Sequence, residues 1–239
     1  GWRLIFVFLL VYGLSIGTAL FLRLPETRKK ATERTSMFKR YAMVLSHRCA
    51  LGFIFSQCFA LAGMFAFITG SPSVYMGYFD ISETVYPFLF GLNVIGMMLA
   101  NRLNIRLLHY YRPQFLLSLG QAAQVLTSLI LLSYVSLATE PNLVIMVILL
   151  ILFIASMGLI VSNATSSTVE FFPQNSATAT ALLGSIGFAA GALSGSLVGL
   201  LGDGTPWPMV VIMFACALIG PLVRTMLQYG QPSPTHNHS

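Results

Sequence analysis

The chain has 239 residues, of which 56% are hydrophobic and only 8% are charged, and its formal net charge is +6. Soluble domains carry about 25% charged residues, so this composition excludes a globular protein that covers itself with a solvated surface. The first residue is Gly rather than Met and an apolar run follows at once, so we expect a segment cut from a longer protein.

Seven charge-poor apolar runs are long enough to cross a hydrocarbon core of about 30 Å as helices. The turn-forming residues Gly70–Ser73 are predicted to end the second of these helices. We therefore predict an all-α membrane protein, and the odd number of spans places the two chain ends on opposite sides. The predicted spans are residues 4–22, 50–69, 84–101, 113–139, 142–162, 177–201 and 204–223.

Residues 25–48 form the one long hydrophilic segment, a basic linker between the first two spans. In its second half Phe38, Tyr41, Val44 and Leu45 share one helical face. That pattern fits a short amphipathic helix at the membrane surface and a plain solvated linker equally well.

Asp80 and Glu83 stand in the D-x-x-E spacing of a capping box before the third span. Capping is a better explanation for two acids at this spacing than attraction of cations. We therefore predict that they begin the third membrane helix.

The basic residues indicate the orientation of the spans. Twelve of the 13 Lys and Arg residues fall on one side of the predicted bilayer, and only Arg3 falls on the other. By the positive-inside rule the basic side is cytoplasmic, so the N-terminus is expected outside (periplasmic) and the C-terminus inside. The net charge thus reflects topology, and no nucleic-acid partner is expected.

Glycine recurs every four residues in the sixth apolar run, although a glycine inside a helix costs about 1 kcal/mol relative to alanine. Small residues let membrane helices approach closely, so we predict that this stripe packs against another helix. A helix that slides against its neighbour would need the same smooth face, although static packing is the favoured reading. The stripe consists of Gly187, Gly191, Gly195 and Gly199.

Motifs for catalysis are missing from the sequence, which contains no G-x-x-x-x-G-K, H-E-x-x-H or G-x-S-x-G. The three Cys residues have no paired spacing, so we expect no disulfide and no metal site. From the missing motifs we expect that the protein is not an enzyme and binds no cofactor. Five amides in the apolar runs are expected to form hydrogen bonds between helices, and two of them share a face with Ser128. The five are Gln57, Asn93, Gln121, Gln124 and Asn163, and Gln121 and Gln124 are the pair beside Ser128.

Four stretches together resemble the Bcr/CflA drug-resistance transporters of the major facilitator superfamily. The opening GWR with the later LPET is similar to that family's sixth helix, and AGMFAFITGSP within residues 41–72 to its seventh. LFGLNVIGMMLANRL (residues 89–103) resembles the eighth helix, and residues 158–201 resemble the tenth and eleventh.

The resemblance implies a twelve-helix carrier in two halves, which exports small amphipathic drugs or metabolites in exchange for protons across the bacterial inner membrane. Residues 1–24 would be the last helix of the first half, 25–48 the central cytoplasmic linker, 49–229 the six-helix C-terminal bundle and 230–239 a disordered tail. No predicted span contains Asp or Glu, so the proton-coupling residue is expected in the first half, outside this chain. We expect a monomer in the lipid bilayer.

Two alternatives stay open. One is a carrier of the same superfamily with a different substrate, and the other is a seven-span receptor of the rhodopsin type. The sequence argues against the receptor, because no span carries a retinal-type Lys and there is no outer pair of Cys residues.

In the family architecture the seventh, eighth, tenth and eleventh helices line the central pathway, and the ninth and twelfth lie outside it. Gln121 and Gln124 belong to the ninth helix and are therefore not expected to bind the ligand. Pockets for amphipathic ligands are mostly apolar with a few polar groups, and flexible Met side chains suit varied ligands. Each candidate on the lining helices could also be ordinary core. The candidates are Gln57, Met64, Phe65, Asn93, Met97 and Met157.

Overall fold

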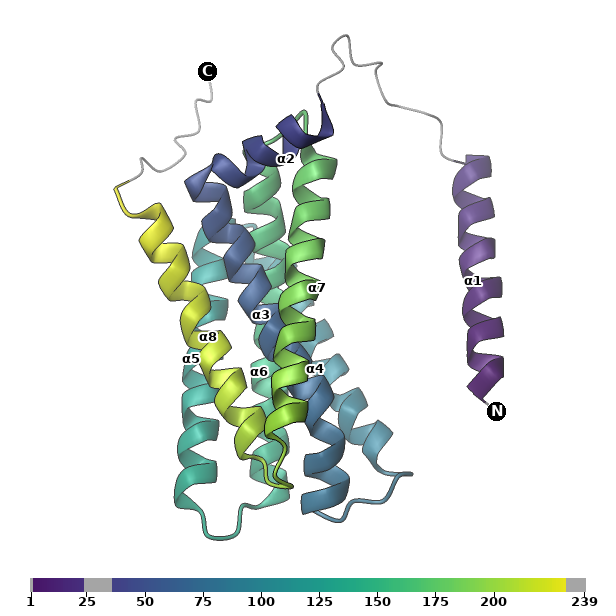
Figure 1. The fold of residues 1–239 in the computed structure, drawn as a ribbon, viewed down its shortest axis with the longest axis vertical. Helices are drawn as coiled ribbons and strands as arrows, with labels where there is room; N and C mark the ends of the chain where they lie inside the picture. Colours follow the sequence, from purple (N-terminus) through teal and green to yellow (C-terminus); the bar gives the residue numbers. More distant parts are fainter. Residues whose placement is uncertain (1, 24–35, 231–239) are drawn as a thin grey trace. The chain divides into compact units, whose positions relative to one another are not determined.

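The computed structural model describes residues 2–23 and 36–230, and these form helices without any strand. The chain divides into two units, Gly1–Ser36 and Met37–Ser239. The first unit contains α1, and the second contains all the other helices (Figure 1). The helices are α1 (Trp2–Arg23), α2 (Met37–Ser46), α3 (Arg48–Pro72), the π-helix η1 (Ser73–Tyr78), α4 (Tyr86–Leu107), α5 (Pro113–Leu137), α6 (Leu143–Glu170), α7 (Ser176–Leu201) and α8 (Trp207–Gln228).

Seven of the described helices are long and apolar enough to cross a membrane, as predicted, with α3 and η1 forming one continuous span. Residues 24–35 of the predicted linker and 231–239 of the predicted tail lie outside the described residues. The second half of the linker is α2, whose Val44 is fully buried against the first turns of α3 and α7. Of the two predicted alternatives, residues 37–46 therefore form the amphipathic helix and not a plain solvated linker.

The predicted end of the second span at Gly70–Ser73 is wrong. Within a bilayer the backbone must satisfy its own hydrogen bonds, so turn-forming residues continue as helix. Pro72 has no N–H for the carbonyl of Ile68, and the Ser71 hydroxyl donates to that carbonyl instead, at 3.5 Å. The helix then widens into η1, where the Phe79 N–H donates to the carbonyl of Val74 at 3.1 Å.

The predicted capping box before the third span is also wrong. Helix α4 begins at Tyr86, and Val85 precedes it without a side-chain cap. Asp80 lies further back in the loop, with a φ of 50°. The carbonyl of Ser82 accepts the N–H groups of Val85 and Tyr86, so the turn caps the helix through its backbone.

In the second unit, α3 and α6 are the two most buried spans. Helix α3 packs against α6, α7 and α8, whereas α6 packs against α3, α4 and α5. Helix α2 lies across the end of the bundle at which α3 and α7 begin (Figure 1). The main core is formed by large side chains of α3, α6 and α8, among them Phe67, Phe153 and Met213.

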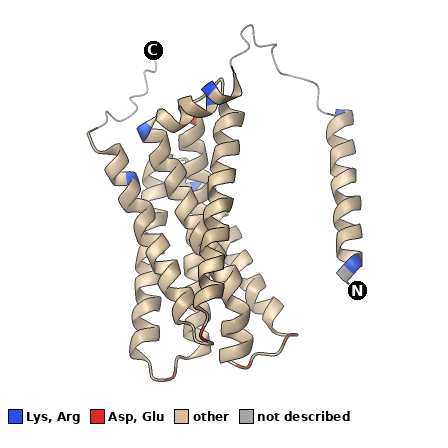
Figure 2. Cartoon of the chain, in the orientation of Figure 1, with Lys and Arg blue, Asp and Glu red and all other residues tan. Residues whose placement is uncertain are grey.

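Charges separate the two ends of this bundle. The loops opposite α2 carry Asp80, Glu83, Glu140 and Asp203, which appear as the red segments at that end in Figure 2. The hydroxyl and N–H of Thr205 donate to Asp203 and hold the pKa of this exposed carboxyl below its usual value. The basic residues of α2, of the α4–α5 connection and of α8 belong to the other end.

Candidate functional site

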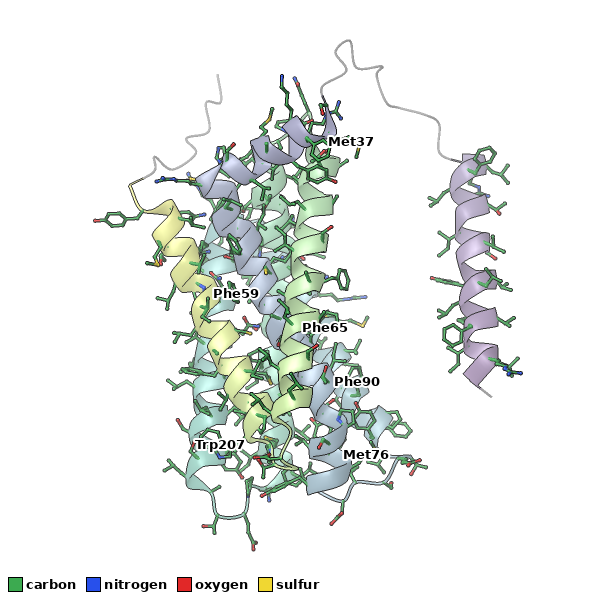
Figure 3. All side chains as sticks on the ribbon, viewed as in Figure 1. Met37, Phe59, Phe65, Met76, Phe90 and Trp207 are labelled. Atoms are coloured by element: carbon green, nitrogen blue, oxygen red, sulfur yellow. The ribbon has the colours of Figure 1, made fainter. Side chains whose placement is uncertain are left out.

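Three of the four predicted stripe glycines lie against α3. A Cβ atom at Gly187 would come within 2.6 Å of Leu61, one at Gly191 within 2.5 Å of Phe65 and one at Gly195 within 2.7 Å of Thr69. Side chains spaced four residues apart on α3 therefore occupy the spaces that the α7 glycines leave. Phe65, labelled in Figure 3, also makes an edge contact with Phe188 at 5.8 Å between ring centroids.

Gly199 differs from the other three glycines. A Cβ atom there would meet nothing within 4 Å, and the residue is exposed in the described bundle. The contact with α3 has ended one turn earlier, at Gly195, so packing within this bundle does not require a glycine at position 199.

Gln57 joins two of the helices that the resemblance assigns to the pathway. Its Oε1 atom accepts a hydrogen bond from the Thr165 hydroxyl of α6 at 2.8 Å. Gln57 is buried, and Thr165 is half-buried. The pair is a polar contact between α3 and α6 that apolar neighbours surround.

The three candidate methionines come together. Met157 of α6 is buried, and Met64 of α3 and Met97 of α4 pack in the same cluster at its margin. Gln124 of α5 donates from Nε2 to the sulfur of Met157 at 3.5 Å. Gln124 is thus a direct neighbour of a candidate residue, although the family architecture places its helix outside the pathway.

Asn93 lies near a residue that sequence reasoning missed. Its Nδ2 group donates to the Leu89 carbonyl at 2.9 Å, while its Oδ1 atom is buried and has no hydrogen-bond partner among the described residues. The hydroxyl of Tyr75 in η1 lies near the Asn93 side chain and is likewise buried without a partner of good geometry. The irregular hydrogen bonding of η1, which apolar periodicity cannot reveal, is the feature that distinguishes this position.

Aromatic rings surround the Tyr75–Asn93 pair. Tyr75 lies 6.0 Å from Tyr86, and Phe90 stacks on Phe67 at 5.7 Å between ring centroids. The Ser71 and Tyr86 hydroxyls share a hydrogen bond of 3.0 Å. The end of the α3–η1 span that lies opposite α2 is therefore joined to α4 by side chains, whereas α4 packs its backbone closely on α6.

Helices α4 and α6 approach each other closely at Gly158. A Cβ atom at Gly158 would lie 2.8 Å from the backbone nitrogen of Asn101 and 3.0 Å from the carbonyl oxygen of Met97. Next to it, Asn163 donates to Asn104 at 2.7 Å, and both side chains are buried. The predicted hydrogen bonds between helices are thus confirmed for Gln57, Gln124 and Asn163.

A buried polar face runs along α5, as predicted for Gln121, Gln124 and Ser128. Gln121 faces α8, with its Nε2 atom 3.7 Å from the position of a Cβ on Gly220. Its Oε1 atom has no partner among the described residues. This face of α5 therefore points into the bundle.

The six candidate residues do not surround one cavity in the described part of the chain. The three methionines form one group, Gln57 pairs with Thr165, Phe65 faces α7, and Asn93 faces Tyr75. The bundle has a small cavity of about 150 Å³ at the end opposite α2, lined by Thr69, Gly70, Val74, Val198, Thr205 and Met209. Drug-sized ligands occupy pockets of about 300–1,000 Å³, so this cavity cannot hold one alone.

Comparison with known proteins gives a consistent set of matches. The profile of the Major Facilitator Superfamily matches residues 1–195. A bicyclomycin resistance protein homolog from Haemophilus influenzae is 33% identical over 232 residues, which are 95% of this chain and 57% of that protein. A chloramphenicol resistance protein from Pseudomonas aeruginosa is 26% identical over 230 residues, covering 92% of this chain and 52% of that protein.

An uncharacterized MFS-type transporter from Bacillus subtilis is 26% identical over 226 residues, covering 92% of this chain and 55% of that protein. The chain therefore spans about half the length of the curated relatives that it matches.

Proposed function

This chain belongs to the Major Facilitator Superfamily, and on that premise we propose that it works within a carrier that exports small amphipathic drugs or metabolites. The resemblance to the Bcr/CflA family is supported by relatives named for resistance to bicyclomycin and chloramphenicol. The chain is a multi-pass membrane protein whose seven spans correspond to the second half of the superfamily fold and the helix that precedes it. That correspondence is the observation that carries the proposal.

The carrier is placed by this proposal in a bacterial inner membrane, with α2 and the C-terminus on the cytoplasmic side. The positive-inside rule supports this orientation, because four acidic loop residues and the basic segments occupy opposite ends of the bundle. The chain acts as a monomer and as a transporter rather than an enzyme.

Proton exchange would depend on residues beyond this chain. In α3–α8, Glu170 is the sole carboxylate, and it is the last residue of α6. Ion-coupled carriers usually keep a carboxylate inside the membrane. We therefore assign proton coupling to the helices of the first half of the carrier that precede α1.

Substrate contacts are assigned to Gln57, Met64, Phe65, Asn93, Met97 and Met157. Met64, Phe65 and Met97 are only partly buried in the bundle, so they can contact a ligand without any rearrangement of its core. Gln57 and Asn93 are the two members of this set that carry hydrogen-bonding groups.

Expression of the full-length carrier in a drug-sensitive bacterium tests the function. We expect raised resistance to bicyclomycin or chloramphenicol, and loss of drug export when a protonophore collapses the proton gradient. Unchanged sensitivity to a broad panel of amphipathic drugs, with normal membrane expression, would favour a carrier of the same superfamily for a different substrate.

A further inference from the structure

Arg224 of α8 differs from every other charged residue of α3–α8, because it is half-buried whereas the others are exposed. Its Nη2 group donates to the Ser118 hydroxyl of α5 at 2.7 Å. Its Nε group is buried and has no hydrogen-bond partner among the described residues. The guanidinium is therefore only partly satisfied by protein groups.

Three helices converge around this side chain. The Arg224 stem packs beside Gly52 of α3, where a Cβ atom would lie 3.3 Å from Arg224 Cγ. Gln228, one turn further along α8, donates from Nε2 to the carbonyl of Cys49 at 3.2 Å. Arg224 thus lies where α3, α5 and α8 meet.

Arg224 lies at the depth expected for lipid headgroups. Arg224 is four residues before the end of α8, which is about 6 Å along a helix axis. The neighbouring spans α3 and α5 begin at this same end with Arg48 and Arg112 directly at their starts. Clustered basic residues at a membrane surface attract anionic lipids.

No ion pair joins Arg224 to a carboxylate of the described residues, and Glu170, the acid at this end of the bundle, is the last residue of α6, which is not among the helices that pack on α8. The helices that pack on α8 are α3, α5 and α7, and none of them contains Asp or Glu. The loops that carry Asp80, Glu83, Glu140 and Asp203 lie at the far end of the bundle. A partly desolvated cation without a counter-ion is costly, so an external anion that reaches the guanidinium would be stabilising.

We propose that Arg224 binds the phosphate of an anionic glycerophospholipid, whose headgroup sits beside the Arg224–Ser118 contact of α8 and α5. The planar guanidinium offers several N–H donors that match phosphate oxygens, and one of them already uses the Ser118 hydroxyl as an anchor. The acyl chains of the lipid would extend along the apolar outer surface of α5 and α8. This site is independent of the proposed transport function and of the six residues assigned to substrate.

Lipid binding to the purified full-length protein in a neutral detergent tests the proposal. Phosphatidylglycerol and phosphatidylcholine are titrated separately, and bound lipid is counted by native mass spectrometry. We expect the wild type to retain phosphatidylglycerol in preference to phosphatidylcholine, and Arg224→Gln to weaken phosphatidylglycerol binding by about tenfold. Arg102→Gln is the matched control, because it removes an exposed Arg of α4 and should leave the affinity within about twofold.

Arg224→Lys keeps the charge and guards against a folding defect in Arg224→Gln, so it should retain most of the preference for phosphatidylglycerol. Competition by millimolar inorganic phosphate would identify a free-anion site and overturn the assignment to a lipid. Equal phosphatidylglycerol binding by wild type and Arg224→Gln, or an equal loss in Arg102→Gln, would overturn it as well.

Discussion

The contact between α4 and α6 permits a sharp test of the structure, through replacement of Gly158 by alanine. A Cβ atom at this position would lie 2.8 Å from the backbone nitrogen of Asn101 and 3.2 Å from the carbonyl carbon of Ala100. Backbone atoms cannot rotate away as a side chain can, so the whole of α4 must move outward. That movement also stretches the neighbouring hydrogen bond between Asn163 and Asn104.

The expected cost follows from these two effects. Overpacking a tight interior costs about 1–3 kcal/mol, and weakening one buried hydrogen bond adds about 0.5–1.5 kcal/mol. Alanine recovers about 1 kcal/mol as a better helix former than glycine. We therefore expect Gly158→Ala to lower the free energy of unfolding by about 1–3 kcal/mol.

Gly184→Ala is the matched control. It gains the same helix propensity on α7, and its added Cβ atom would meet nothing within 4 Å. We expect it to be neutral or stabilising by up to about 1 kcal/mol.

Both variants can be compared with the wild type by reversible unfolding in mixed micelles, followed by circular dichroism. If Gly158→Ala and Gly184→Ala agree within about 0.5 kcal/mol, the close α4–α6 approach is refuted.

Three further predictions follow from other contacts. Leucine at position 191 or 195 should lower the yield of folded protein, because Gly191→Leu collides with Phe65 and Gly195→Leu with Thr69. Gly199→Leu is the control and should be tolerated. A wild-type yield for the first two variants would contradict the packing. A cysteine placed at Arg106 should label only from the cytoplasmic side, and one placed at Ser82 only from the outer side. External labelling at position 106 would reverse the proposed orientation. A cysteine at Thr35, which lies outside the described residues, should also label from the cytoplasm. Tyr75→Phe removes a buried hydroxyl without a partner and should leave the free energy of unfolding unchanged or slightly higher. Tyr86→Phe breaks the hydrogen bond to Ser71 and should lower the free energy of unfolding by about 1 kcal/mol. A larger loss in Tyr75→Phe would show that its hydroxyl is bonded to Asn93.

The number of spans could be predicted from the sequence, because hydrophobic runs are local features. The error at Gly70–Ser73 has a physical cause that local reasoning can include. Gly, Ser and Pro terminate helices in water, where freed backbone groups find solvent, but a bilayer offers them no such partner. The same four residues therefore continue α3 into η1.

The arrangement of the candidate site could be predicted only in part. The resemblance predicts which helices line the pathway, but it does not tell which face of a helix a residue occupies. Met157 faces Gln124 of α5, and Asn93 faces Tyr75, and both contacts depend on how whole helices are rotated. Arg224 entered the sequence argument only as one charge in a count, because its contact with Ser118 joins residues 106 positions apart.

The α3–α7 contact shows why one glycine pattern fits both static packing and sliding. Leu61, Phe65 and Thr69 repeat every four residues opposite glycines with the same spacing, so a shift by four residues, about 6 Å, would bring Phe65 opposite another glycine. Packing alone therefore distinguishes the registers weakly.

The hydrogen bond from the Ser194 hydroxyl to the Ala62 carbonyl, at 2.7 Å, selects the observed register. On its other faces α3 interlocks with bulky side chains, since Phe153 fills the space at Gly63 and Met209 the space at Gly70. Helix α7 is consequently the neighbour against which α3 can shift with the least repacking. Two hydrogen bonds oppose that shift, the one from Ser194 and the one from the Cys58 thiol to the carbonyl of Ile186 at 3.7 Å.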